Sequence, residues 1–200
     1  MLRKMHTVTH DRMHPASDKL DALARQAKDY ALHMMRTAGS VPLTVIADTK
    51  DGYVFCVPGA FTDDAAKDRF ADVARLVAVA HDACALALIA EAWASLPDAR
   101  GHLDTETPPS QSPNRQEIVA LMLEDGTRQG SMLIPIVRGW NGAFVGFGNT
   151  APVAYGQSEG RFSGMMPPRK PGPEDRAKAA AILQALGLNI ANRGFDPKLN

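Results

Sequence analysis

The sequence predicts one α+β domain with a mainly antiparallel sheet of about five strands, two helices packed on the sheet and a C-terminal helix. Three observations support this fold class. Apolar runs of strand length follow one another between residues 83 and 138, with no helix-length segment between them. Asp-Gly pairs at 51–52 and 125–126 join neighbouring runs, as expected for hairpins. No phosphate-binding pattern of the form GxxxxGK[ST] or GxGxxG is present.

The balance of charged residues limits which kinds of partner the protein is expected to bind. The chain has 200 residues, of which 45% are hydrophobic and 22% charged, a length and composition that suit one domain. Lys+Arg and Asp+Glu are both 22, so the formal net charge is zero. This balance argues against a general nucleic-acid binder, which usually has a basic excess. It also gives little electrostatic protection against self-association.

The cysteines and the apolar runs indicate the compartment. Cys56 and Cys84 lie in apolar, strand-like contexts, so we expect buried reduced thiols and no disulfide framework. The first ten residues lack the apolar core of a secretory signal, and no stretch reaches the roughly 20 apolar residues that span a bilayer. We therefore expect a cytoplasmic protein without a membrane partner.

The chain divides into three parts: a flexible leader at 1–16, a core domain at 17–138, and an irregular extension with a final helix at 139–200. His6, His10 and His14 are spaced four apart, and on a helix this spacing could bind a metal. Pro15 argues against a helix continuing through that point, so we interpret the leader as a polar tail. We expect no bound metal and no cofactor.

Three segments have helical patterns. Residues 17–36 carry apolar side chains at three- and four-residue steps behind a candidate cap, Ser17. Residues 62–81 repeat the pattern behind Thr62. The last helix is expected at 173–186, where a proline begins the segment and Gly187 follows it.

The remaining core segments have strand patterns. Residues 42–58 predict a hairpin, whose Asp48 and Asp51 could hold a cation, although turn chemistry explains both. Residues 84–94 predict a central strand, covered on both faces over at least its first half. Strands at 116–125 and 131–138 follow. Pro135 lacks an N–H group, so the last strand is expected at an edge or with a bulge.

The strongest candidate site joins two carboxylates and an arginine. Glu91 lies in an apolar run, so its carboxylate must be paired, hydrogen-bonded or exposed. If the strands around Glu91 and Glu117 are antiparallel neighbours, Glu91 approaches Arg115 and Glu117, and Arg115 could pair with Glu91 through two hydrogen bonds. The group is either a structural salt bridge or a polar site, in which two close carboxylates supply a general acid or base. Trp93, Glu124 and Asp125 are further candidate binding residues.

The same stretch carries a resemblance to a known family. Glu91-Ala-Trp93, the loop Pro113-Asn-Arg115-Gln-Glu117 and the strand end Leu-Met-Leu-Glu-Asp125 resemble the EAW strand, PxRxE loop and ED strand end of a family of uncharacterised proteins from bacteria and their phages. The resemblance covers roughly residues 80–138. It implies a phage or mobile-element association and transfers no activity.

Our leading hypothesis is a small soluble accessory or interaction protein, which binds an unknown protein partner or a second copy of itself. One alternative is a hydrolase-like or ligand-binding protein that uses Glu91, Arg115 and Glu117; an ordered, concave carboxylate cluster would favour it. Another is a nucleic-acid accessory protein that uses the basic residues Arg161, Arg169 and Lys170. A flat, apolar, exposed strand edge near 132–137 would favour the interaction protein.

Overall fold

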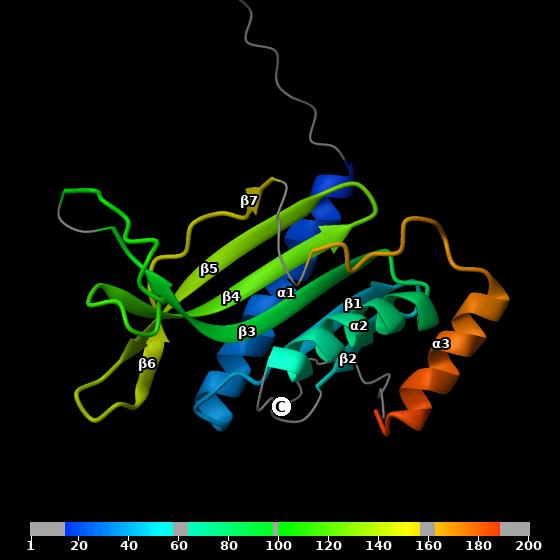
Figure 1. Ribbon diagram of the computed structural model, residues 1–200, viewed down its shortest axis with the longest axis horizontal. Coiled ribbons are helices and arrows are strands. Elements are labelled where there is room, and N and C mark those ends of the chain that lie inside the picture. Colours follow the sequence, from blue (N-terminus) through cyan, green and yellow to red (C-terminus); the bar gives the residue numbers. More distant parts are fainter. Residues whose placement is uncertain (1–14, 58–63, 98–99, 157–162, 189–200) are drawn as a thin grey trace, which may run out of the picture.

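The computed structural model describes residues 15–57, 64–97, 100–156 and 163–188, and within them the chain forms three helices and one seven-stranded sheet (Figure 1). The elements, in chain order, are α1 (Pro15–Thr37), β1 (Thr44–Thr49), β2 (Gly52–Cys56), α2 (Asp64–Ala80), β3 (Ala85–Ser95), β4 (Arg115–Asp125), β5 (Gln129–Arg138), β6 (Phe144–Phe147), β7 (Ala154–Tyr155) and α3 (Pro173–Ala185).

The sheet is antiparallel throughout. Its order is β2-β1-β3-β4-β5-β6, and β7 pairs with the first part of β5. The α+β class and the antiparallel sheet are therefore confirmed. The expected number of about five strands is too low, because β6 and β7 lie in the glycine- and proline-rich stretch after Arg138. Such short strands leave only a weak alternation in the sequence.

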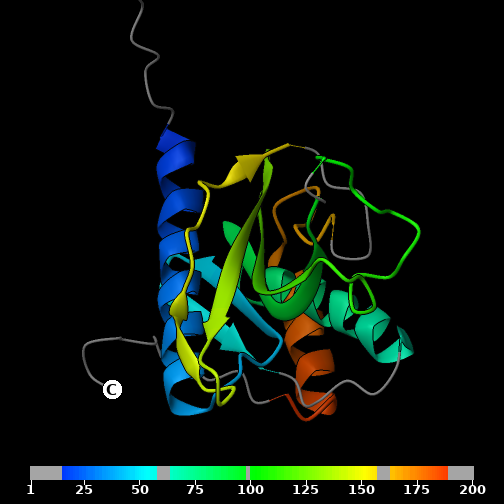
Figure 2. The same cartoon turned by 90° about the vertical axis from the view of Figure 1, so that its left-hand side faces the viewer.

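Helices cover the two faces of the sheet unequally. Helix α1 packs on one face of β3, β4 and β6, and α2 packs on the other face, with α3 against α2 (Figure 2). Each face has its own buried cluster: Ile89 and Leu121 belong to the cluster under α1, whereas Leu86 and Leu88 belong to the cluster under α2. This alternation confirms that the first half of β3 is covered on both sides.

The helix boundaries differ slightly from expectation. Helix α1 begins at Pro15, two residues before the expected cap, because a proline in the first turn needs no N–H partner. Helix α2 begins at Asp64, and the cap expected at Thr62 lies outside the described residues. The predicted leader histidines, the basic residue Arg161 and the last dozen residues also lie outside them.

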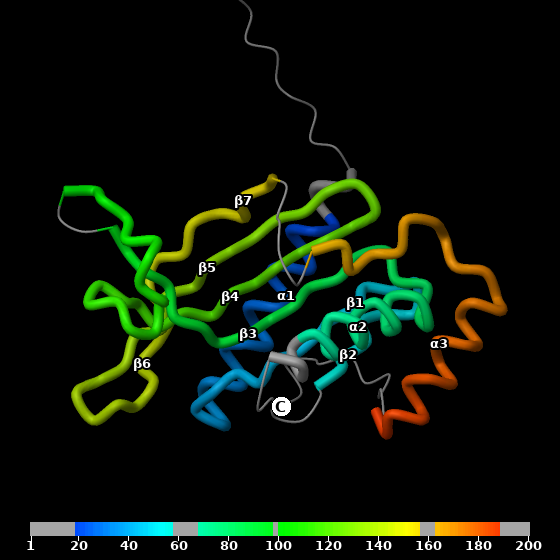
Figure 3. Tube along the Cα trace, viewed as in Figure 1, coloured from blue at the N-terminus to red at the C-terminus, as the bar shows by residue number. Residues whose placement is uncertain are grey.

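The strand before the extension is flanked by two short strands. β6 pairs with β5 from Ile136 onward, β7 pairs with Gly130 and Ser131, and a register shift follows Val137. Pro135 lies between the two pairings, where no N–H group is needed. Figure 3 shows the chain returning from β6 along β5 to β7. Residues 132–135 thus form an edge of the sheet, which is the first of the two expected arrangements, and the register shift lies beyond Pro135.

The two cysteines are free but differ in exposure. Cys56 is buried, and burial raises the pKa of its thiol to about 11. Cys84 is exposed, which corrects the expectation of a buried thiol, and its Sγ lies 3.3 Å from Asp48 Oδ2. The Asp48 carboxylate expected in the turn thus contacts the residue that precedes β3.

Candidate functional site

The register of β3 against β4 separates Glu91 from Arg115. Glu91 lies opposite Val119, and Arg115 lies opposite Ser95. Four residues along a strand correspond to about 13 Å. The predicted Glu91–Arg115 pair therefore does not form, although the two strands are antiparallel neighbours as expected.

Glu91 instead holds the start of β1 in place. Its Oε1 accepts a hydrogen bond of 2.6 Å from the backbone N–H of Val41, in the connection between α1 and β1. Val41 is itself part of the buried cluster under α1. The carboxylate thus satisfies a backbone donor in the connection that follows α1.

Glu117 is engaged by an arginine that the sequence interpretation did not assign to it. Arg138 donates from Nε to Glu117 Oε2 over 2.7 Å and from Nη2 to Oε1 over 2.6 Å. This two-point pairing is the strong geometry for arginine and carboxylate. It lowers the pKa of Glu117, chiefly through the hydrogen bonds from Arg138, and raises the pKa of Arg138. Glu117 is therefore ionised, with both oxygens occupied.

Arg115 and Trp93 form an exposed pair. The guanidinium carbon of Arg115 lies 4.9 Å from the ring centroid of Trp93, within the range of a cation–π interaction. Arg115 Nη1 also donates to the carbonyl of Ser110 over 2.6 Å, which ties the 96–114 loop to β4. Trp93 remains 43% exposed. Tryptophan and arginine are the residues most enriched at the energetic centres of protein interfaces.

Glu124 and Asp125 have structural partners. Glu124 is 6% exposed, and its carboxyl group accepts the backbone N–H groups of Met165 and Met166 over 2.9 and 3.2 Å. Asp125 Oδ1 accepts the N–H groups of Thr127 and Arg128, which closes the β4–β5 turn. Neither side chain is free for a ligand at the position where the sequence suggested binding.

Most exposed apolar side chains gather at one end of the sheet. We define this open end as residues 90–97, 100–120 and 133–147, on the left of Figure 1. Seven of the eleven large apolar side chains exposed in the described part of the chain lie there: Trp93, Leu96, Leu103, Leu133, Val137, Trp140 and Val145. The other four, Val57, Tyr155, Ile182 and Leu186, are scattered.

One face of the open end carries no charge. Side chains that point to the α2 side form cross-strand rows, of which the first is Ala90, Ala120 and Leu133, and the second is Ala92, Ile118 and Pro135. Leu133 is 52% exposed. Figure 1 shows that α2 and α3 lie over the opposite half of the sheet and no helix covers these rows. The exposed part of this face is therefore the position of Leu133, next to the predicted strand edge, whereas Ile118 in the second row is only 5% exposed and is already covered within the chain.

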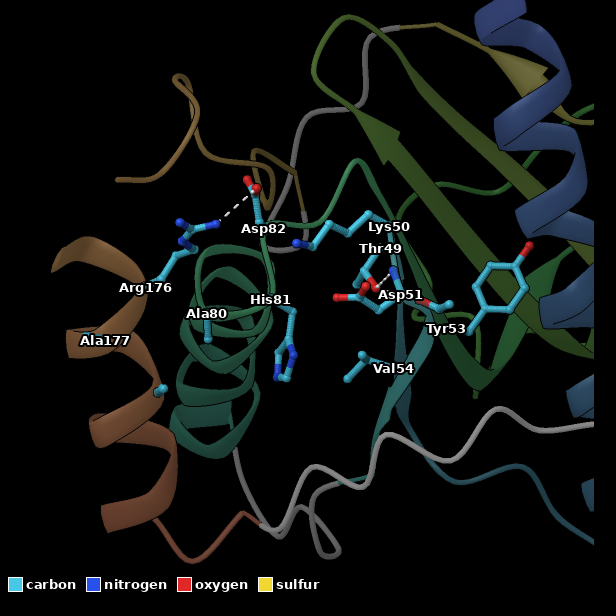
Figure 4. Close-up of a pocket in the computed structure, with 12 residues that line it drawn as sticks. Thr49, Lys50, Asp51, Tyr53, Val54, Ala80, His81, Asp82, Arg176 and Ala177 are labelled. Carbon is cyan, nitrogen blue, oxygen red and sulfur yellow. Dashed lines mark hydrogen bonds and ion pairs between the residues drawn. The ribbon is translucent and has the colours of Figure 1, made fainter. Parts of the chain in front are cut away.

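A polar cavity lies at the other end of the molecule, between the β1–β2 turn, the end of α2 and α3 (Figure 4). Its volume is about 470 Å³, and its polar side chains are Lys50, Asp51, His81, Asp82 and Arg176. Only Asp51 among them was considered from the sequence, as a possible cation ligand in the turn. No sequence spacing connects Asp51 and His81 to Arg176, which is nearly 100 residues away and reaches the cavity through the packing of α3 on α2.

Within the described residues, no group of three or more His, Cys, Asp or Glu side chains is placed to hold a metal ion. None of the described helices is long and apolar enough to cross a membrane. Comparison with protein-family models, with curated protein sequences and with solved structures gave no match.

Proposed function

We propose that this chain is an interaction protein that assembles with a second copy of itself through the open end of the sheet. The observation that carries the proposal is the concentration of exposed apolar side chains there, with Leu133 on an uncharged sheet face. Monomeric proteins rarely leave such patches uncovered unless they bind something. The proposal includes the cytoplasmic location predicted from the sequence.

A second copy suits this surface because the surface is self-complementary. The row of Ala90, Ala120 and Leu133 holds small and apolar side chains, which allow two sheets to pack face to face at about 10 Å, while the buried Ile118 supports this row from within the chain. The face carries no charged side chain that would repel its own copy, and the formal net charge of the chain is zero. A two-fold axis through the face would use the same patch on both copies.

The Trp93–Arg115 pair lies at the same end of the sheet but on its other face. It lies on the α1 side of the open end, where β3 passes beyond α1, and Trp140 is fully exposed in the β5–β6 turn nearby. Trp93 points away from the apolar rows, to the other face of the sheet, so of these residues only Trp140 is placed to add contacts at the rim.

The hydrolase-like alternative loses its support from geometry. Glu91 accepts a backbone N–H group, and both oxygens of Glu117 accept from Arg138. The lowered pKa of Glu117 leaves it without a proton to donate near neutral pH, whereas a general acid needs a pKa close to the working pH.

The hypothesis of a nucleic-acid accessory protein also has less support than that of an interaction protein. Of its three basic residues, Arg169 lies 3.6 Å from Asp175, and Lys170 lies 3.7 Å from Asp82. Cations that face carboxylates of the same chain contribute less to phosphate binding than free ones. The phage or mobile-element association rests on the motif resemblance alone.

Sedimentation equilibrium tests the proposal. We expect a monomer–dimer equilibrium with a Kd on the order of micromolar. Leu133→Asp would place a charge in the interface and weaken the dimer at least about tenfold. Ile182→Asp, at a similarly exposed apolar position on α3, is the matched control and should leave the equilibrium unchanged. A chain that stays monomeric up to about 100 µM, or a dimer that Leu133→Asp leaves intact, would contradict the proposal.

A further inference from the structure

We propose that the polar cavity between the β1–β2 turn, α2 and α3 binds a small zwitterion, an amino acid with a short aliphatic side chain. The cavity lies at the opposite end of the molecule from the open end of the sheet, so this inference is independent of the proposed assembly. It rests on three unpartnered polar groups, a balanced pair of charges and an apolar floor.

Three polar side chains of the cavity have no partner among the described residues. Lys50 and Asp51 form the two-residue loop between β1 and β2, and His81 follows the last residue of α2. Figure 4 shows the three side chains directed into the same space between the hairpin and α2. Groups of this kind, converging on one cavity, are the usual mark of a small-molecule site.

The loop that carries two of these groups has a fixed shape. Thr49 Oγ1 donates to the carbonyl of Gly52 over 2.7 Å and accepts the N–H of Asp51 over 3.2 Å. Gly52 has a φ of +110°, which a residue with a side chain rarely adopts. The turn is therefore held in place before any ligand arrives, which reduces the entropy lost on binding.

The opposite wall is also fixed. Asp82 has a φ of +48° and ends α2, with its N–H donated to Val79 and the N–H of Ala83 donated to Ala78. A left-handed residue at this position is usually glycine, and the aspartate costs roughly 1–2 kcal/mol in comparison. Its carboxylate lies 3.2 Å from Arg176 Nη1 on α3. The strained residue thus joins α2 to α3 across the rim.

The charges favour a zwitterion over a simple ion. Asp82 is engaged by both Arg176 and Lys170, over 3.2 and 3.7 Å, which leaves the ammonium group of Lys50 and the carboxylate of Asp51 without partners among the described residues. A ligand with one carboxylate and one ammonium group satisfies both. A simple anion would lie beside the like charge of Asp51, and a simple cation beside the like charge of Lys50, so each would meet repulsion from one of the two side chains.

His81 adds neutral hydrogen bonding to the site. Partial burial lowers its pKa, so the imidazole is uncharged at neutral pH. A neutral imidazole has one donor and one acceptor, and it leaves the charge balance between Lys50 and Asp51 unchanged.

The remaining lining accommodates an aliphatic side chain. Val54 of β2 and the alanines Ala80, Ala177 and Ala180 form the apolar part of the cavity. Alanine at three positions leaves room where larger side chains would fill the space. A volume of about 470 Å³ lies within the range of small-molecule pockets.

Isothermal titration of the full chain with three related compounds tests the proposal. L-Leucine carries both charges, isovalerate is a branched carboxylate one carbon shorter that has no ammonium group, and isopentylamine is leucine without the carboxylate. We expect leucine to bind with a Kd of about 0.1–1 mM and the other two at least about tenfold more weakly. The matching readout is the imidazole NMR signal of His81, which should shift with leucine.

Two variants and one control locate the binding. Asp51→Asn and Lys50→Met should each weaken leucine binding about tenfold or more. Lys178→Met removes an exposed lysine of α3 that pairs with Glu174 and lies outside this cavity, so it should have no effect. Isovalerate binding as tightly as leucine would indicate an anion site and overturn the proposal. No leucine binding at about 10 mM, or an equal loss in Lys178→Met, would do the same.

Discussion

The two ends of the sheet are made of the same kinds of residue, but only one end is covered. Leu88 on β3 and Leu133 on β5 both point to the α2 side, yet Leu88 is 0% exposed and Leu133 is 52% exposed. Helix α2 has 17 residues and is about 25 Å long, whereas the 11 residues of β3 extend about 36 Å. The strands therefore pass beyond the helix, and their apolar faces remain open.

This difference teaches that an apolar strand pattern indicates a surface to be covered and does not say what covers it. The first half of β3 is covered by helices of the same chain, α1 on one face and α2 on the other. At the open end we assign the cover to a second copy. The following predictions separate the two cases, beginning with the largest expected effect.

Truncation of the two leucines should show the contrast directly. Leu88→Ala should lower the free energy of unfolding by about 2–5 kcal/mol, because it leaves a cavity in a closed cluster. Leu133→Ala should cost about 1 kcal/mol or less in the dilute monomer. Urea unfolding, followed by circular dichroism, measures both. Equal losses would mean that the open end is covered within one chain.

Glu124 should be the most costly carboxyl group to remove. Glu124→Ala leaves the N–H groups of Met165 and Met166 without their acceptor and should cost roughly 2–4 kcal/mol. Amide hydrogen exchange should rise at these two residues before it rises elsewhere. Glu124→Gln keeps one acceptor oxygen and is the conservative control. If Glu124→Ala is as stable as the wild type, the carboxyl group does not anchor this segment.

Two double-mutant cycles compare the salt bridge that forms with the one that does not. Glu117→Gln and Arg138→Met should show a coupling of about 1 kcal/mol, reduced by water because the pair is partly exposed. Glu91→Gln and Arg115→Met should show a coupling near zero, because the register holds these residues apart. A sizeable coupling between Glu91 and Arg115 would contradict the register of β3 against β4.

The pH dependence of stability should follow Glu117. Its folded-state pKa lies below the ordinary value of 4.5, mainly because Arg138 donates to the carboxylate. Its contribution is therefore complete above that unfolded value and is lost as the pH falls through the folded pKa. Between pH 6 and pH 3, Glu117→Gln should lose less stability than the wild type. Parallel curves for the two proteins would show that the pair adds nothing.

Local patterns predicted most of the fold, and long-range packing determined the site. Capping residues, turn glycines and alternation indicated the helices and the five longer strands, because these signals act within a few residues. The partner of Glu117 could not be found this way, since Arg138 reaches it across the β4–β5 pairing. The same limit applies to Glu124, whose partners Met165 and Met166 lie in an extension without a regular pattern.

The register of β3 against β4 explains why the predicted Glu91–Arg115 pair does not form. The sequence placed Glu91 and Arg115 on adjacent antiparallel strands, and that part is correct. The position of one strand against the other depends on the connecting loop, which is long here and has no fixed turn signal. A shift of a few residues moved Arg115 from Glu91 to the ring of Trp93.

Fluorescence quenching of the tryptophans tests the assembly at the open end most directly. The chain has two tryptophans, and both Trp93 and Trp140 lie there. As the protein concentration rises from about 1 µM to about 100 µM, quenching by acrylamide should fall and the emission should shift to shorter wavelength, and Leu133→Asp should abolish both changes. The change should come from Trp140, because Trp93 points to the other face of the sheet. If a dimer forms while Trp140 stays as accessible as in the monomer, the open end is not the interface.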